Sequence, residues 1–156
     1  MVSGSAKAIE WMRANVNATW MSEHLPGETG RLKLIPLAVS APFHCSLMTP
    51  AENEMRALLE KTEFHVPKWA VVQNLTADAS SDPSAIRECL IGQISGTVLW
   101  TQCQEELLNR EIGNYVEFGA GRVLSGLSKK IAGDKARVFN LNSLEDLKTL
   151  EAATKI

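Results

Sequence analysis

A histidine and a cysteine stand side by side in residues 40–48, which read SAPFHCSLM. Histidine exchanges protons near neutral pH, so His44 is a candidate general base, and the thiol of Cys45 is a candidate nucleophile. Neighbours in an extended segment point to opposite faces, which disfavours a direct hydrogen bond between these two side chains. A histidine in a loop often has only a structural role, so the residues by themselves leave the role of His44 open.

The other imidazoles and thiols show no spacing typical of a metal site; they are His24, His65, Cys89 and Cys103. With Cys45 the chain has an odd number of cysteines and no CxxC pair, which is typical of reduced thiols in a cytosolic protein. We therefore expect no metal and no redox cofactor.

Residues 119–126 read GAGRVLSG and lie where a strand is predicted to lead into a helix, a place where phosphate groups often bind. The third glycine falls too late for a GxGxxG motif, and no Lys-Ser/Thr pair follows as a P-loop requires. A tight turn explains these glycines better than phosphate binding does.

The segment that holds His44 is expected to lie between a strand and a helix. Residues 32–37 alternate as a half-buried strand does until Pro36, and Thr49 is predicted to cap a helix that runs to about Thr62. In that helix Pro50 would occupy the first turn, Glu52 would reach back to the cap, and Met55, Leu58 and Leu59 would face inward. Before the strand, the sequence predicts a helix over 5–16 and an exposed loop over 22–30.

Strands and helices alternate through the rest of the chain. Strands are predicted over 70–74, 114–118 and 137–139, the first of them covered on both faces. Helices are predicted to open at residues 81–83, at a capping box over 101–104, after Gly121 and at Ser143. This alternation predicts an α/β fold with a parallel sheet flanked by helices.

The composition describes an ordinary globular chain. It has 156 residues, 45% of them hydrophobic, with 16 basic against 18 acidic residues and a formal charge of −2. No basic cluster marks a nucleic-acid surface, and no apolar run reaches the roughly 20 residues that cross a bilayer. We expect a cytoplasmic protein that binds neither nucleic acid nor membrane.

Four motifs in order resemble the C-terminal portion of bacterial malonyl-CoA:acyl-carrier-protein transacylases. They are residues 36–48 (PLAVSAPFHCSLM), 71–74 (VVQN), 91–94 with 98–101 (IGQI and VLWT) and 117–127 (EFGAGRVLSGL). The resemblance implies the end of a parallel-sheet, hydrolase-like α/β acyltransferase domain over 40–156. Residues 1–39 would be the last helix and strand of a small ferredoxin-like subdomain.

The resemblance also implies a reaction and its residues. In this family a serine takes the malonyl group from malonyl-CoA and passes it to the phosphopantetheine thiol of acyl carrier protein, in fatty-acid or polyketide synthesis. His44 would be the general base that activates the serine, and the backbone carbonyl of Gln93 would orient it. Phe43 would bound the acyl pocket and favour malonyl over methylmalonyl groups.

The family's serine elbow (GHSxG) has no counterpart here, since no GxSxG occurs among the 156 residues. A base without its nucleophile performs no acyl transfer, so we expect this chain to be inactive alone. The apolar faces of Ile9, Trp11, Met12 and Leu34 are expected to be uncovered, which predicts poor solubility or self-association. A non-catalytic α/β binding module and one half of a split acyltransferase remain the alternatives.

Overall fold

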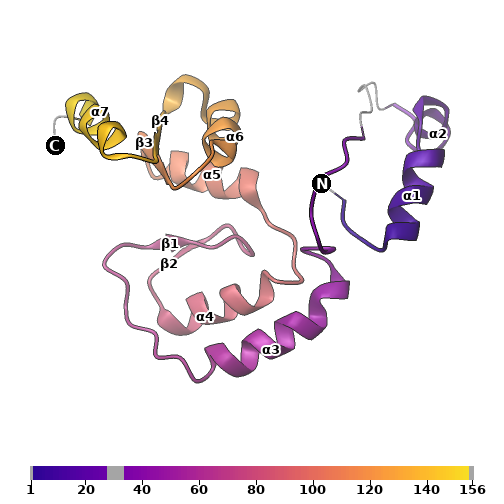
Figure 1. Cartoon of the computed structure of the whole chain (residues 1–156), viewed down its shortest axis with the longest axis horizontal. Helices are drawn as coiled ribbons and strands as arrows, with labels where there is room; N and C mark the ends of the chain where they lie inside the picture. The colour runs from indigo at the N-terminus through magenta and orange to yellow at the C-terminus, as the bar shows by residue number, and fades with distance from the viewer. Residues whose placement is uncertain (1, 28–33, 155–156) are drawn as a thin grey trace. The chain divides into compact units, whose positions relative to one another are not determined.

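The computed structural model describes residues 2–27 and 34–154 as helices joined by loops and short strands (Figure 1). The chain divides into two compact units, one from Met1–Phe64 and Leu90–Val98, the other from His65–Cys89 and Leu99–Ile156. The predicted boundary between residues 39 and 40 falls inside the first unit and stays a prediction. The elements in order are α1 (Ala6–Asn15), α2 (Ala18–His24), η1 (Ser46–Met48), α3 (Thr49–Leu59), β1 (Val71–Val72), β2 (Ala79–Ser80), α4 (Pro83–Gly92), α5 (Trp100–Asn109), β3 (Asn114–Phe118), α6 (Val123–Ala132), η2 (Gly133–Lys135), β4 (Arg137–Leu141) and α7 (Leu144–Thr154).

Side-chain caps start both N-terminal helices. The hydroxyl of Ser5 accepts from the N–H of Ala8 at 3.3 Å, and this confirms the helix predicted over 5–16. The side-chain oxygen of Asn17 accepts from the N–H of Trp20 at 3.1 Å and starts α2, which overlaps the predicted loop. The exposed loop is therefore wrong for residues 22–24, and its residues 28–30 lie outside the described residues.

The segment before His44 is irregular. The strand predicted over 32–37 is wrong for residues 34–37, which have no strand hydrogen bonds, while residues 32 and 33 lie outside the described residues. A strand needs a partner for its backbone groups, and none of the described segments pairs with this one.

Helix α3 begins where the sequence predicts, but by another mechanism. Met48 is its N-cap and makes no side-chain cap, while the Thr49 hydroxyl donates to the carbonyl of Ser46 at 2.7 Å. Pro50 lies in the first turn, as predicted. Met55 and Leu58 are exposed in this structure, so their predicted inward orientation is wrong.

The predicted covered strand over 70–74 is shorter and more open than expected. Only Val71–Val72 form β1, which pairs antiparallel with β2 in the register Val71↔Ser80 and Val72↔Ala79. Val71 is exposed, so β1 is not the central parallel strand that its apolar run indicated. The helix opening at residues 81–83 is confirmed as α4, because the Asp82 carboxylate accepts from the N–H of Ala85 at 3.0 Å.

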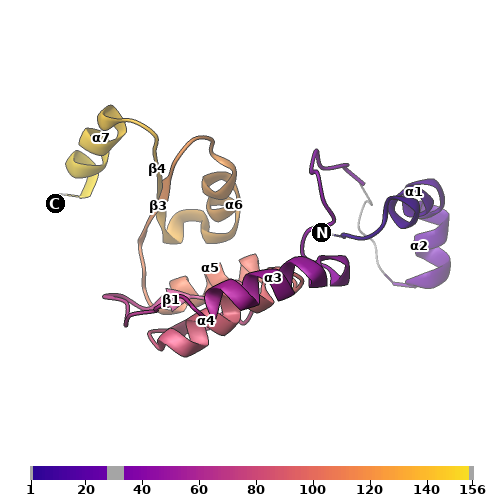
Figure 2. The ribbon, with the colours of Figure 1, turned by 60° about the horizontal axis from the view of Figure 1, so that its bottom comes forward.

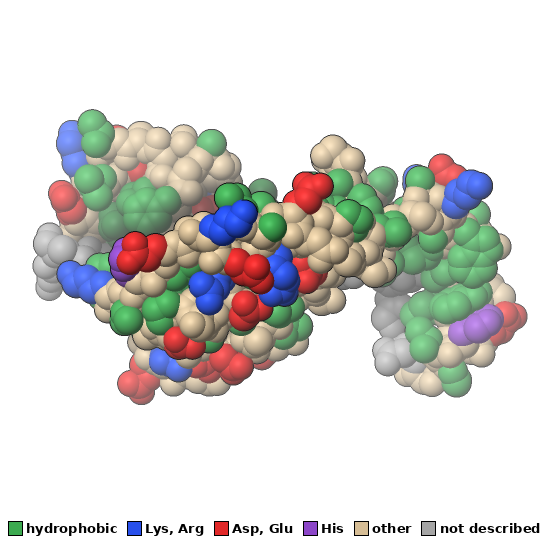
Figure 3. Space-filling model, turned by 90° about the horizontal axis from the view of Figure 1, so that it is seen from below, with side chains coloured by type: hydrophobic (Ala, Val, Ile, Leu, Met, Phe, Trp, Pro, Cys, Tyr) green, Lys and Arg blue, Asp and Glu red, His purple; other side chains and the backbone are tan. Residues whose placement is uncertain are grey.

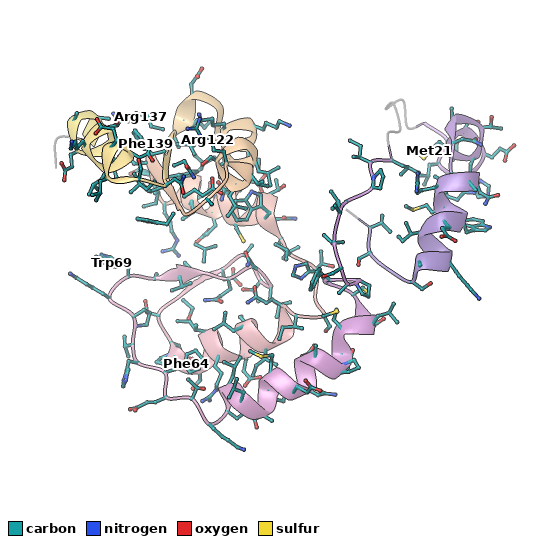
Figure 4. The ribbon with its side chains drawn as sticks, in the orientation of Figure 1. Met21, Phe64, Trp69, Arg122, Arg137 and Phe139 are labelled. Atoms are coloured by element: carbon teal, nitrogen blue, oxygen red, sulfur yellow. The ribbon has the colours of Figure 1, made fainter. Side chains whose placement is uncertain are left out.

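The parallel sheet predicted from the alternation of elements is confirmed as a pair, β3 with β4 (Figure 2). The strands align from Asn114↔Arg137 to Phe118↔Leu141, and α6 connects them and packs against both. At the start of β4 the Arg137 guanidinium carbon lies 5.9 Å from the centre of the Phe139 ring (Figure 4). The same guanidinium donates to the carbonyl of Ala153 at 2.7 Å, which ties α7 to β4.

Carboxylate side chains accept hydrogen bonds at the N-termini of α6 and α7. Oε2 of Glu117, near the end of β3, accepts from the N–H of Ser125 at 2.9 Å in α6, and the Ser125 hydroxyl donates to the same oxygen. Ser143 and Asp146 bond reciprocally at the start of α7, as in a capping box. The helix predicted near residue 101 is confirmed as α5, although its N-cap, Leu99, makes no side-chain cap.

Many large apolar side chains of the described residues are exposed to solvent. Ile91 is fully buried and Ile86 nearly so, but Phe118 and Leu144 are about 80% exposed. Hydrophobic side chains also form much of the visible surface of α1 and α2 (Figure 3), where Trp11 is exposed. The sequence expectation of uncovered apolar faces is confirmed for Trp11, whereas Ile9, Met12 and Leu34 are half-buried.

Candidate active site around His44

His44 has an unusual backbone conformation. Its φ of +60° lies in the left-handed region, which few residues other than glycine adopt, although histidine is enriched there. Such a conformation is maintained only when surrounding contacts hold it, and it is commonest at functional sites. The neighbouring thiol of Cys45 donates to the carbonyl of Pro42 at 3.1 Å, so it is directed away from a base–nucleophile pair with His44.

The structure brings together two residues that are 49 positions apart. Nδ1 of His44 lies 2.9 Å from the carbonyl oxygen of Gln93. Gln93 directly follows α4, where carbonyl groups lack partners within the helix and accept hydrogen bonds from other segments. Because a carbonyl only accepts, Nδ1 must carry the proton, and Nε2 of the neutral ring is left as the acceptor. That arrangement suits a general base.

A second link joins the same two segments and was missed by the sequence analysis. The hydroxyl of Ser95, two residues beyond Gln93, donates to Oε2 of Glu52 in the first turn of α3. The sequence did single out Glu52, but as a residue that reaches back to the helix cap. Nothing in the spacing of residues 52 and 95 predicts their contact.

Phe43 and His44 line one open cavity of about 930 Å³ within the first unit. Their ring centres are 6.5 Å apart and the rings are tilted by 49°. The cavity is also lined by Ile9 and Met12 of α1 and by residues 34–37 and 39–42. Phe43 is 44% exposed, so its ring is available to contact a ligand held beside His44.

The glycine turn between β3 and α6 does not form a phosphate site. Gly119 and Gly121 have φ of +111° and +92°, which the turn requires and which glycine adopts at little cost. The Glu117 carboxylate occupies the N–H groups of Leu124 and Ser125 that an anion would need. Hydrogen bonds from Ser125 also lower the pKa of Glu117 and keep it charged. The side chain of Asn140 donates to the carbonyl of Gly121 at 2.8 Å and holds the turn closed.

Over residues 2–27 and 34–154, no three His, Cys, Asp or Glu side chains gather as a metal site would require. In the same part of the chain, no helix is both long and apolar enough to cross a membrane.

No family model matches the chain. A malonyl CoA-acyl carrier protein transacylase of Haemophilus influenzae is 33% identical over 124 residues, covering 80% of this chain and 39% of the relative. The crystal structure of a malonyl-CoA:acyl carrier protein transacylase from Xanthomonas oryzae pv. oryzae matches with a TM-score of 0.79 and 33% identity, over 96% of this chain and 44% of that one. A malonyl-transacylase solved in complex with a type II polyketide synthase acyl-carrier protein matches with a TM-score of 0.69 and 35% identity, over 76% and 38%.

These similarities, with the parallel β3–α6–β4 unit, define an α/β acyltransferase fold. The chain is a homologue of the malonyl-CoA:acyl-carrier-protein transacylases. It spans about two fifths of the length of the relatives it matches, 39% of the first and 44% of the second.

Proposed function

We propose that this chain supplies the histidine half of a malonyl-transfer site, which moves a malonyl group from malonyl-CoA to the phosphopantetheine thiol of acyl carrier protein. The observation that carries the proposal is the 2.9 Å contact between Nδ1 of His44 and the Gln93 carbonyl. A partner of the same kind is seen in a relative, since a malonyl-transacylase has been solved in complex with an acyl-carrier protein.

The chemistry proceeds in two transfers. Nε2 of His44 takes the proton of a serine hydroxyl as its oxygen attacks the thioester carbonyl of malonyl-CoA, and the C–S bond breaks. The proton passes to the departing coenzyme A thiolate. The carrier protein's thiol, deprotonated in turn by His44, then attacks the serine ester, whose oxygen recovers the proton. Neither transfer requires a metal or redox group, and the proposed setting is the cytoplasm.

The nucleophilic serine belongs to the part of the family that the 156 residues do not resemble, so this chain is proposed to be inactive alone. Gln93 contributes its backbone carbonyl, and its side chain is proposed to have little part in the reaction. Phe43 borders the acyl group, where its ring leaves room for malonyl more readily than for methylmalonyl.

The test is the intact mass of the chain after incubation with malonyl-CoA. The chain alone should gain no mass. Co-expressed with the serine-bearing N-terminal part of the Haemophilus influenzae relative, it should yield malonyl transfer to acyl carrier protein. The variant His44→Ala should slow this transfer by about 10²–10⁴-fold, the usual contribution of a general base, while Cys45→Ala should leave it unchanged.

Two outcomes would contradict the proposal. A malonyl adduct on the chain alone would assign the nucleophile to a residue present here, and Cys45 would be the first to examine. A co-purified complex without transfer activity would instead favour a non-catalytic binding module.

A further inference from the structure

Glu52 is held where it can influence the geometry of His44 without touching it. It lies in the first turn of α3, eight positions after His44, and its side chain is only 19% exposed. Its Oε2 accepts from the hydroxyl of Ser95. The turn after α4 is thus joined both to the loop of His44, through Gln93, and to the first turn of α3, through Ser95 and Glu52.

The turn after α4 is short and stiff on its helix side. The N–H of Ile94 donates to the carbonyl of Ile91 at 3.2 Å, and that of Gly96 donates to Gly92 at 2.9 Å. These bonds fix the turn to α4 but not to α3. The bond from Ser95 to Glu52 ties this turn to α3, and hydrogen bonds to charged groups are stronger than neutral ones.

We propose that Glu52 is a positioning residue for His44: through Ser95 it fixes the turn whose Gln93 carbonyl holds the proton of the imidazole on Nδ1. Glu52 makes no contact with the reacting atoms in this scheme. The role of His44 as a base rests on the proposed function, whereas the hydrogen bonds that link Glu52, Ser95, Gln93 and His44 do not.

An ordinary surface role for Glu52 gives a different expectation. Its Oε1 lies 3.9 Å from the guanidinium of Arg56, one helical turn on, and ion pairs between neighbouring turns of a helix contribute little. If that pair were the whole role of Glu52, Ser95 would be irrelevant to the state of His44. Substitution of Ser95 therefore separates the two roles, because it leaves the pair with Arg56 intact.

The experiment measures the tautomer of the neutral His44 ring by ¹⁵N NMR of the imidazole nitrogens in the 156-residue chain. Its three histidines are assigned with a His44→Asn variant. Glu52→Ala and Ser95→Ala should each move the equilibrium from the Nδ1–H form toward the Nε2–H form by about two- to tenfold, as expected from the loss of one hydrogen bond. The double variant should shift it no further than either single one, because both remove the same link.

Glu54→Ala is the matched control, since Glu54 is an exposed carboxylate on the same helix. Equal shifts in Glu54→Ala and Glu52→Ala would overturn the inference and assign the effect to the charge of α3. An unchanged tautomer in Ser95→Ala would overturn it too. Circular dichroism of each variant checks that α3 is retained, and Glu52→Gln, which keeps an acceptor oxygen, should shift the equilibrium less than Glu52→Ala. None of these readouts depends on acyl transfer, so failure of the proposed function would leave them interpretable.

Discussion

The carboxylate of Glu117 accepts hydrogen bonds from both the backbone N–H and the hydroxyl of Ser125, and so joins the end of β3 to the first turns of α6. These bonds favour the charged form and lower the pKa of Glu117 below its ordinary value of 4.5. A carboxyl whose pKa is lowered by folding stabilises the folded chain above that ordinary value. Its contribution is lost as the pH falls through the lower value of the folded state.

Glu117→Gln should therefore destabilise the chain at neutral pH. The further decrease in stability as the pH falls should be smaller in this variant than in the wild-type chain. The measurement is the urea midpoint from neutral pH to below pH 4.5, the ordinary value for this carboxyl. The pKa of Asp146 is lowered as well, chiefly by the Ser143 hydroxyl, so some acid sensitivity should remain. Glu105→Gln, on the exposed face of α5, should leave the profile like that of the wild-type chain; an equal effect there would refute the assignment.

Ile91→Ala should be the most damaging of the simple core substitutions. Ile91 is fully buried at the end of α4, two residues before Gln93. Truncating a buried isoleucine to alanine costs about 2–5 kcal/mol. Denaturant unfolding measures this loss, and Leu58→Ala, at a position 58% exposed, is the control that should change stability far less. Similar losses in both variants would show that the core near α4 is loosely packed.

Phe43→Ala should relax the choice between acyl groups in the complex completed with a serine-bearing partner. Removing the ring enlarges the site beside His44, and one methylene of pocket volume discriminates by about 1–3 kcal/mol. The ratio of kcat/KM for methylmalonyl-CoA to that for malonyl-CoA should rise by about tenfold or more. Phe64→Ala serves as a control for the loss of an aromatic ring, and an unchanged ratio in Phe43→Ala would assign Phe43 to ordinary loop packing.

The isolated chain should self-associate, because large apolar side chains such as Phe118, Val123 and Leu144 are more than 70% exposed. Sedimentation velocity over a range of concentrations measures this directly. Binding of a complementing N-terminal part should suppress it. A stable monomer at every concentration would contradict the expectation.

The sequence predicts well those elements whose signals are local. Asp82 caps α4 and the glycines before α6 make the turn that their spacing indicates. The predicted strands were wrong for residues 34–37 and too long at 70–74, because a strand depends on distant partners: the described segments supply none for 34–37 and only the short β2 for β1. Thr49 failed as a cap because its hydroxyl found the carbonyl of Ser46 instead.

Some residues of the candidate site were predicted from the sequence, and others were found only in the structure. His44, Phe43 and Gln93 came from motifs that resemble a family, and the structure places His44 and Gln93 in contact. The contact between Glu52 and Ser95 follows from no motif, since it joins residues 43 positions apart that have no shared spacing. Only the three-dimensional arrangement of α3 against the turn after α4 reveals it.

The left-handed backbone of His44 also bears on how this position could change over time. Glycine would relieve the strain there, yet it would remove the imidazole and its contact with the Gln93 carbonyl. At position 44, relief of backbone strain favours glycine, whereas the proposed acyl transfer requires histidine. A lineage that did not need the proposed transfer would be free to replace the histidine, so retention of His44 among close relatives would support the proposed function.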